Sequence, residues 1–226
     1  MKREQFLKQW PALAKNYQAS PEVLKHISGI TLCMIIVPSG VGKSSLIEQT
    51  GFDFVPSDTT RPARPGEQEG LDMYFRKDYD QVMADIKAGR FVQIAPFATG
   101  DFYATKATSY PASGVGIMPV MANVIPIFRS LGFKDTISAF ITPPSYDEWM
   151  RRLQSHPVPP EKIASRMEEA KRSFDFALTD KQTHFILNDN LQKATIQVRQ
   201  LLKGEIDKNR EDLGRQAAQA IRAGIN

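Results

Sequence analysis

The sequence predicts an α/β fold with a mainly parallel central sheet, and three observations lead to this prediction. An apolar run over residues 31–36 stops at a glycine-rich turn and is followed at once by a helix-like segment. A second apolar run, over residues 137–141, has the composition of a central strand. Helical patterns over residues 81–88 and 161–178 alternate with strand candidates. Such alternation implies right-handed crossovers between parallel strands.

The length and composition are those of one domain with extensions. The chain has 226 residues, and a hydrophobic content of 42% is enough to bury one sizeable core. A net charge of +4 suits an anionic small molecule and gives little support to nucleic acid as a partner. Cys33 is the only cysteine and lies in the apolar run, so we expect no disulfide and a reducing, cytoplasmic compartment. We expect no membrane association, because no apolar stretch has the length of a span and the first residues lack a signal-peptide core.

The glycine-rich turn predicts a phosphate-binding loop. Gly40 and Gly42 allow backbone N–H groups to point inward around phosphate oxygens. Lys43 supplies a positive charge for the β- and γ-phosphates, and Ser44 offers a hydroxyl to Mg²⁺. Val37 stands where such loops normally have glycine, so the first turn must be reached from an extended backbone. An ordinary strand-to-helix turn is the alternative. The residues predicted to bind the triphosphate are Ser39, Gly40, Val41, Gly42, Lys43, Ser44 and Ser45.

A second candidate for anion binding lies in residues 57–67, which read SDTTRPARPGE. The prolines hold this segment extended, and Arg61 and Arg64 each carry a guanidinium that can form two hydrogen bonds to a phosphate. An exposed polar loop is the alternative interpretation.

These two motifs resemble those of the guanylate kinase family, whose members carry GPSG-x-GKS followed at this separation by S-x-TTR-x-PR-x-GE. Further matches follow in family order almost to Leu201. The resemblance implies a three-layer P-loop NTPase fold with a mainly parallel sheet, a small subdomain that binds a nucleoside monophosphate (NMP), and a lid that closes over ATP. The further matches are FITPPS at residues 140–145, RRL at 151–153, RMEEA at 166–170 and ILND at 186–189.

The resemblance also implies a domain organisation. We expect a guanylate-kinase-like domain over residues 29–204, with the NMP-binding subdomain at about residues 57–106 and the lid at about residues 151–166. Residues 1–28 and 205–226 are predicted to be helical extensions at the two ends.

Helix-breaking residues subdivide both extensions. Pro11 and Pro21 predict two short N-terminal helices, packed on the main domain or serving as a partner-binding arm. The C-terminal extension is predicted to belong to one long amphipathic helix over residues 196–221, which Gly204 and Gly214 can interrupt.

By resemblance, Arg61, Arg64 and Tyr103 bind the phosphate of the acceptor nucleotide. The family has another phosphate-binding tyrosine at the position of Met73. We predict that Tyr74 takes this role through a one-residue slip, because a methionine has no hydrogen-bond donor.

The residues that would bind the acceptor's base depart from the family pattern. The family carries F-L-E-x-A where this chain has FVQIA at residues 91–95, so Gln93 replaces a carboxylate. An amide can accept from guanine N1–H and donate to O6, but it can equally complement the edge of adenine. Ser57 and Thr105 are the other predicted base-binding residues.

The predicted catalytic groups are cations. Residues 115–123 contain no acid where the family ends a strand with D-x-D, so Mg²⁺ would be bound by Ser44, phosphate oxygens and waters. Arg152 and Arg166 are expected to contact the transferring phosphoryl group together with Lys43, with ordinary helix-surface arginines as the alternative. Asn188 is predicted to line the adenine side of ATP or to cap the following helix.

The function implied is ATP-dependent phosphorylation of an NMP, with GMP converted to GDP and Mg²⁺ as cofactor. We expect a monomer or homodimer with ATP and an NMP as its ligands and no nucleic-acid partner. Two alternatives remain open. One is a kinase of the same fold with a different acceptor, such as another NMP or a ribose bisphosphate. The other is a non-catalytic guanylate-kinase-like binding module.

Overall fold

The structure is a computed structural model that describes residues 1–38, 40–96, 100–155 and 160–225. Two compact units, which we call the first and second unit, make up the chain. The first contains Met1–Thr31, Asp53–Gly116 and Pro126–Asp135, and the second contains Leu32–Phe52, Ile117–Ile125 and Thr136–Asn226. Within the described ranges, no helix combines the length and apolar character needed to cross a bilayer.

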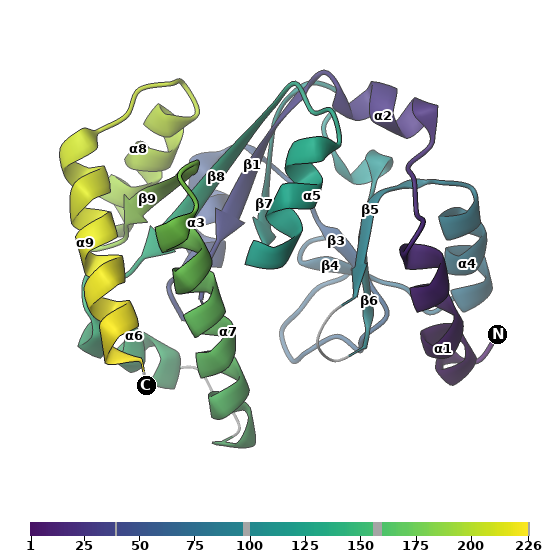
Figure 1. Cartoon of the computed structure of the whole chain (residues 1–226), viewed down its shortest axis with the longest axis horizontal. Helices are drawn as coiled ribbons and strands as arrows, with labels where there is room; N and C mark the ends of the chain where they lie inside the picture. The colour runs from purple at the N-terminus through teal and green to yellow at the C-terminus, as the bar shows by residue number, and fades with distance from the viewer. Residues whose placement is uncertain (39, 97–99, 156–159, 226) are drawn as a thin grey trace. The chain divides into compact units, whose positions relative to one another are not determined.

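The elements alternate between helix and strand along most of the chain (Figure 1). Up to residue 109 they are α1 (Arg3–Ala14), α2 (Pro21–Ile27), β1 (Ile30–Ile36), α3 (Lys43–Thr50), β2 (Asp53–Phe54), β3 (Ser57–Thr59), β4 (Met73–Phe75), α4 (Tyr79–Lys87), β5 (Phe91–Pro96), β6 (Phe102–Lys106) and the 3₁₀ helix η1 (Ala107–Ser109). The remaining elements are β7 (Gly114–Val120), the 3₁₀ helix η2 (Ala122–Val124), α5 (Ile125–Ser130), β8 (Asp135–Thr142), α6 (Tyr146–Gln154), α7 (Pro160–Thr179), β9 (Thr183–Leu187), α8 (Leu191–Leu201) and α9 (Lys208–Gly224).

The larger sheet has five strands in the order β2-β7-β1-β8-β9 and is mainly parallel. In it, β8 and β9 pair in parallel, with Phe140 opposite Phe185. Every side chain of β1 is buried except that of Thr31, which is half-buried. Such continuous burial is typical of a strand covered on both faces. The α/β fold with a mainly parallel sheet is therefore confirmed.

Helices of the second unit pack on this sheet through aromatic and small residues. Phe174 of α7 lies edge-on against Phe140, with ring centroids 4.9 Å apart. Helix α9 runs beside β9 (Figure 1), and a Cβ at Gly214 would lie 3.2 Å from the Cβ of Phe185. Gly214 therefore permits close packing of α9 and does not interrupt it. The predicted helix over residues 196–221 is broken only at Gly204, where φ is 78°.

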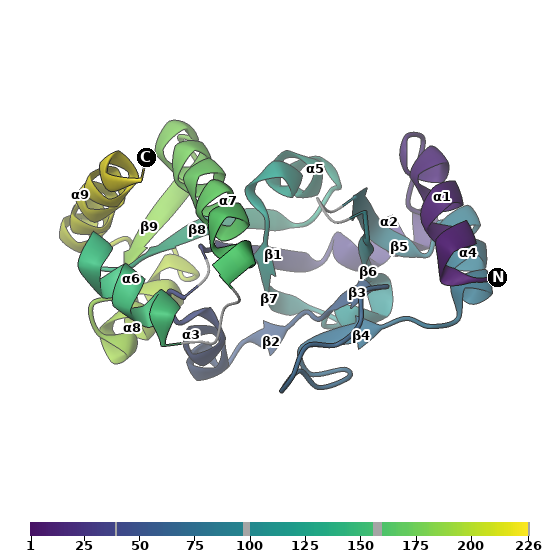
Figure 2. The same ribbon diagram turned by 90° about the horizontal axis from the view of Figure 1, so that it is seen from below.

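The first unit contains a four-stranded sheet in the order β4-β3-β6-β5. Phe6 and Trp10 of α1 are fully buried in its hydrophobic core. Both lie edge-on against Phe102 of β6, with centroid distances of 5.7 and 5.2 Å. Helices α1 and α4 lie next to each other in both views (Figures 1 and 2). The N-terminal extension thus packs against the four-stranded sheet.

The predicted helix break at Pro11 is wrong, because α1 continues through Pro11 to Ala14. Proline's fixed φ is compatible with a helix, so the cost is chiefly one hydrogen bond and a steric clash one turn earlier. Burial of Phe6 and Trp10 offsets that cost. Pro21 behaves as predicted, since α2 begins there after the N-cap Ser20.

We expect Trp10→Ala to lower the free energy of unfolding by about 3–5 kcal/mol, because it empties a fully buried aromatic site. Urea unfolding followed by fluorescence and circular dichroism measures the change. Gln9→Ala, at an exposed position of the same helix, should change it by less than about 0.5 kcal/mol. Equal effects of the two substitutions would show that α1 does not contribute to the core.

Candidate functional site

The loop between β1 and α3 has a backbone conformation that favours glycine at two positions. Gly40 has a φ of 85° and Gly42 a φ of 86°, both in the left-handed region. Every positive φ among the described residues belongs to glycine, so Val37 keeps a negative φ. Gly42 is the N-cap of α3, and residues 43–45 form its first turn. The N–H groups of such a turn have no helical acceptor and are available to an anion.

The predicted phosphate-binding side chains differ in exposure. Val41 is buried, Lys43 is half-buried, and Ser44 and Ser45 are exposed at the start of α3. Ser39, which was also predicted to bind the triphosphate, lies outside the described residues. The side chain of Val41 is therefore packed in the interior, while the hydroxyls of Ser44 and Ser45 are accessible to a ligand.

Two neighbouring segments of the second unit fix the shape of this loop. The Nδ2 of Asn188 donates to the carbonyl oxygen of Val41 at 2.7 Å. On the other side, a Cβ at Gly40 would lie 3.0 Å from the Cα of Leu153. Asn188 thus contacts the loop itself, and the N-cap of α8 is Asn190, so the predicted capping role of Asn188 is wrong.

The predicted lid arginine Arg152 is bound to its own helix. Its Nε donates to Glu148 at 2.7 Å and its Nη2 to the carbonyl oxygen of Asn188 at 3.1 Å. Glu148 also accepts two hydrogen bonds from Arg151. Hydrogen bonds from Arg151 and then Arg152 lower the pKa of Glu148 to about 2. The carboxylate is therefore a permanent counter-ion of both arginines at neutral pH.

The other predicted lid arginine, Arg166, lies on α7 and is half-buried. The tip of the predicted lid, residues 156–159, lies outside the described residues.

The four-stranded sheet of the first unit has two different faces. Side chains alternate between the faces of a strand, and Ile94, Phe102 and Ala104 belong to the hydrophobic core with α1 and α4. The residues between them point to the opposite face, where Gln93 pairs with Thr105. We call this opposite side the polar face. It consists of Ser57, Thr59, Gln93, Tyr103 and Thr105.

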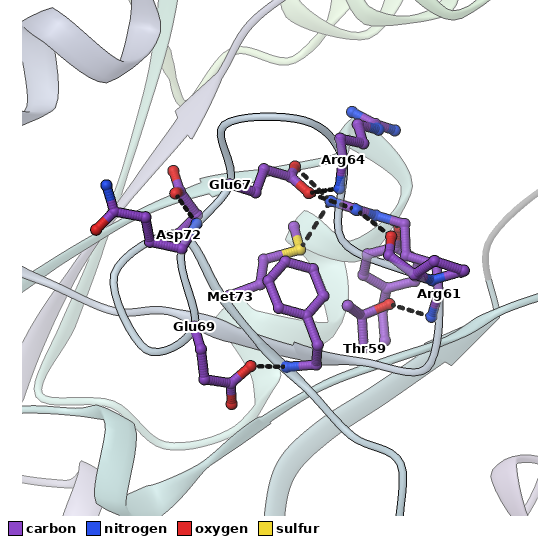
Figure 3. A network of polar contacts seen from close by, with 11 residues as sticks. Thr59, Arg61, Arg64, Glu67, Glu69, Asp72 and Met73 are labelled. Atoms are coloured by element: carbon purple, nitrogen blue, oxygen red, sulfur yellow. Dashed lines mark hydrogen bonds and ion pairs between the residues drawn. The ribbon is translucent and has the colours of Figure 1, made fainter.

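Arg61 lies beside the polar face and is 9% exposed. Its Nε donates to the hydroxyl of Tyr103 at 3.0 Å, and its two terminal nitrogens each donate to Glu67 at 2.7 Å (Figure 3). The sulfur of Met73 lies 3.3 Å from Nη2. The backbone N–H of Arg64 also donates to Glu67, and the Arg64 side chain is exposed. Arg61 thus contacts Tyr103 directly, and the backbone of Arg64 is linked to Arg61 through Glu67.

One of the predicted base-binding residues, Thr105, forms a hydrogen bond that the sequence did not indicate. The hydroxyls of Thr105 and Tyr110 lie 2.8 Å apart, and both residues are buried. Burial raises the pKa of Tyr110, which keeps its hydroxyl protonated at neutral pH. Gln93 is 7% exposed, and its Oε1 is buried with no hydrogen-bond partner among the described residues. An unpaired buried oxygen of this kind is suited to accept from a ligand.

A model of the guanylate kinase family matches residues 30–205 of this chain. The chain belongs to the guanylate kinase family. It is 32% identical over 180 residues to the guanylate kinase of Synechococcus sp. (strain JA-3-3Ab), which covers 76% of this chain and 81% of the relative. It is 31% identical over 185 residues to that of Streptococcus agalactiae serotype III (strain NEM316), covering 74% and 83%. A crystal structure of guanylate kinase from Anaplasma phagocytophilum, 21% identical, shares the fold with a TM-score of 0.56 over 80% of this chain and 88% of that one.

One residue predicted from the guanylate kinase pattern lies away from the others. The guanidinium of Arg76 lies over the ring of Tyr74, 4.6 Å from its centroid. The neighbours of Tyr74 on β4, Met73 and Phe75, instead contact Arg61. Because side chains alternate along β4, Tyr74 points to the face opposite Arg61. The one-residue slip that we predicted for Tyr74 does not occur in the register of β4.

We expect Gly40→Ala to lower the free energy of unfolding more than a glycine-to-alanine substitution at another position with a positive φ. Gly132→Ala is the matched control, since its φ is 83° and a Cβ there would have no neighbour within 4 Å. Both substitutions strain the backbone, but only Gly40→Ala also forces a methyl group against the backbone of α6. The additional loss of unfolding free energy should be about 1–3 kcal/mol, measured by urea unfolding. Equal losses would contradict the close contact with Leu153.

Proposed function

We propose that this protein is an ATP-dependent kinase that phosphorylates a nucleoside monophosphate, with GMP as its acceptor and GDP as the product. The observation that carries the proposal is the grouping of Gln93, Tyr103 and Thr105 on one face of a sheet, with Arg61 beside it. A base-binding amide and hydroxyl next to a guanidinium match the two ends of a nucleotide. Family membership supports the same activity.

The phosphate loop is the proposed binding site for ATP. Backbone N–H groups at the start of α3 would donate hydrogen bonds to the phosphate oxygens, and Lys43 would neutralise charge on the β- and γ-phosphates. The hydrogen bond from Asn188 to the carbonyl oxygen of Val41 would keep the loop in shape for the anion. The contact of Asn188 with adenine stays a prediction.

The residues present are compatible with Mg²⁺ that arrives bound to the nucleotide. Within the described part of the chain, no group of three His, Cys, Asp or Glu residues could hold a metal ion. The exposed hydroxyl of Ser44 offers one oxygen ligand, and Mg²⁺ usually keeps several waters and binds substrate phosphates. When bound, the ion would neutralise charge that develops between the β- and γ-phosphates.

Catalysis by these residues would rest on positioning and charge neutralisation. The acceptor phosphate is already an anion, so the reaction needs no strong general base. Arg61, Arg64 and Tyr103 would orient this phosphate. Lys43, with Arg152 and Arg166 from the proposed lid over residues 151–166, would stabilise charge on the transferring group. Arg152 can do so only after it exchanges its contact with Glu148 for one with phosphate.

Base selectivity depends on Gln93. A neutral amide lacks the charge-assisted hydrogen bonds that a carboxylate would make to guanine, which are about twice as strong as neutral ones. A different acceptor, another NMP or a ribose bisphosphate, is therefore the second candidate function. A non-catalytic binding module is the third candidate, favoured by the absence of acids on β7.

The activity is tested by ADP release with ATP·Mg²⁺ and GMP, dGMP, AMP, UMP, CMP or ribose 1,5-bisphosphate as acceptor. We expect GMP to give the highest kcat/KM, and Lys43→Ala to lower kcat by at least about a hundredfold. Lys25→Ala, on the exposed face of α2, should leave it unchanged. No ADP release with any acceptor would support the binding module and overturn the kinase proposal.

Selectivity is tested by Gln93→Glu. A carboxylate accepts from both N1–H and N2–H of guanine but faces the N1 acceptor of adenine, so the ratio of kcat/KM for GMP over AMP should rise about tenfold, equivalent to about 1.4 kcal/mol. Gln93→Leu, which removes both polar atoms, should lower kcat/KM for both nucleotides. An unchanged ratio in Gln93→Glu would show that residue 93 does not contact the base.

A further inference from the structure

The guanidinium of Arg61 has all five of its N–H groups directed at acceptors. Nε donates to Tyr103, and Nη1 donates to the carbonyl of Pro62 at 2.9 Å and to Glu67. Nη2 donates to Glu67 and to the sulfur of Met73. A phosphate that binds Arg61 must therefore take the place of one of these acceptors.

The acceptors differ in how readily they can be replaced. A thioether sulfur is a weak acceptor, so the N–H directed at Met73 is the one most easily given to a phosphate oxygen. The carboxylate of Glu67 accepts two parallel hydrogen bonds at 2.7 Å, which is a strong bidentate arrangement.

Glu67 connects the two arginines of the predicted phosphate site. Its Oε1 accepts from Nη2 of Arg61, and its Oε2 accepts from both Nη1 of Arg61 and the backbone N–H of Arg64. Burial alone would raise the pKa of Glu67, but these hydrogen bonds outweigh it and lower the pKa below its usual value. Glu67 is therefore ionised at neutral pH. Two arginines and one carboxylate leave one net positive charge for an anionic phosphate.

We propose that Glu67 is a positioning residue of the acceptor-phosphate site, a role that rests on the proposed kinase function. It fixes the plane of the Arg61 guanidinium so that the N–H near Met73 is the donor presented to the phosphate. It also holds the backbone of Arg64 through the N–H group, which fixes the position from which the exposed Arg64 side chain extends. Glu67 itself does not touch the phosphate.

Glu69 provides a matched control in the same loop. Its Oε2 accepts the backbone N–H of Phe75 at 2.9 Å (Figure 3). Both glutamates therefore hold the loop through hydrogen bonds, but only Glu67 contacts the guanidinium of Arg61. A purely structural effect should appear in both variants, whereas a positioning effect should appear only at Glu67.

The test compares Glu67→Gln and Glu69→Gln by steady-state kinetics and by calorimetric titration with GMP. We expect Glu67→Gln to raise the KM for GMP and its dissociation constant about tenfold, the loss of one charge-assisted hydrogen bond. The KM for ATP and kcat should stay within about twofold, because Glu67 does not contact the transferring group. Glu69→Gln should match the wild type in all these quantities.

Two results would overturn the proposal. Equal KM values for GMP in the two variants would make Glu67 a loop-stabilising residue only. A lower KM in Glu67→Gln would show that Glu67 competes with the phosphate for Arg61. If Glu67→Gln does not fold, Glu67→Asp replaces it. The aspartate keeps the charge but is too short to reach both arginines at once, so we again expect the KM and the dissociation constant for GMP to rise about tenfold. If the wild-type protein binds GMP but releases no ADP, the kinase function fails while the calorimetric comparison still tests the role of Glu67.

Discussion

Alternation of side chains along a strand is the constraint on which the small sheet of this protein depends. On β6, Phe102 and Ala104 must face the hydrophobic core formed with α1 and α4. Tyr103 and Thr105 must then face the opposite way, away from that core. Burial of one face thus selects the residues of the other, and the N-terminal helix that carries Trp10 contributes to the site by closing the opposite side of the same sheet.

One predicted phosphate-binding arginine in each unit is paired with a carboxylate. Glu67 holds Arg61 in the first unit, and Glu148 holds Arg152 in the second. A guanidinium in such a pair is held in one orientation before a ligand binds, so less side-chain entropy is lost on binding. The cost is that a phosphate must replace a protein acceptor. At Arg61 that acceptor is the weakly accepting sulfur of Met73, whereas at Arg152 it is the half-buried carboxylate of Glu148.

Much of the fold and part of the site follow from the sequence because short motifs determine local geometry. The order of residues 40–44 fixes a left-handed turn and a helix start, and the spacing of Arg61 and Arg64 fixes a shared loop. The outcome at Pro11 depended on tertiary burial, which local rules do not include. The face of Tyr74 depended on the register of β4 against β3, and a shift of one residue reverses every side chain.

The most direct test of this account is which face of the small sheet the acceptor contacts. Nuclear Overhauser spectroscopy of the protein saturated with GMP, with methyl groups of isoleucine, alanine and threonine labelled, makes this measurement. The account predicts cross-peaks from the guanine and ribose protons to the methyl group of Thr105 and the ring of Tyr103, and none to the methyl groups of Ile94 and Ala104. Cross-peaks to Ile94 or Ala104, or none to either face, would contradict it.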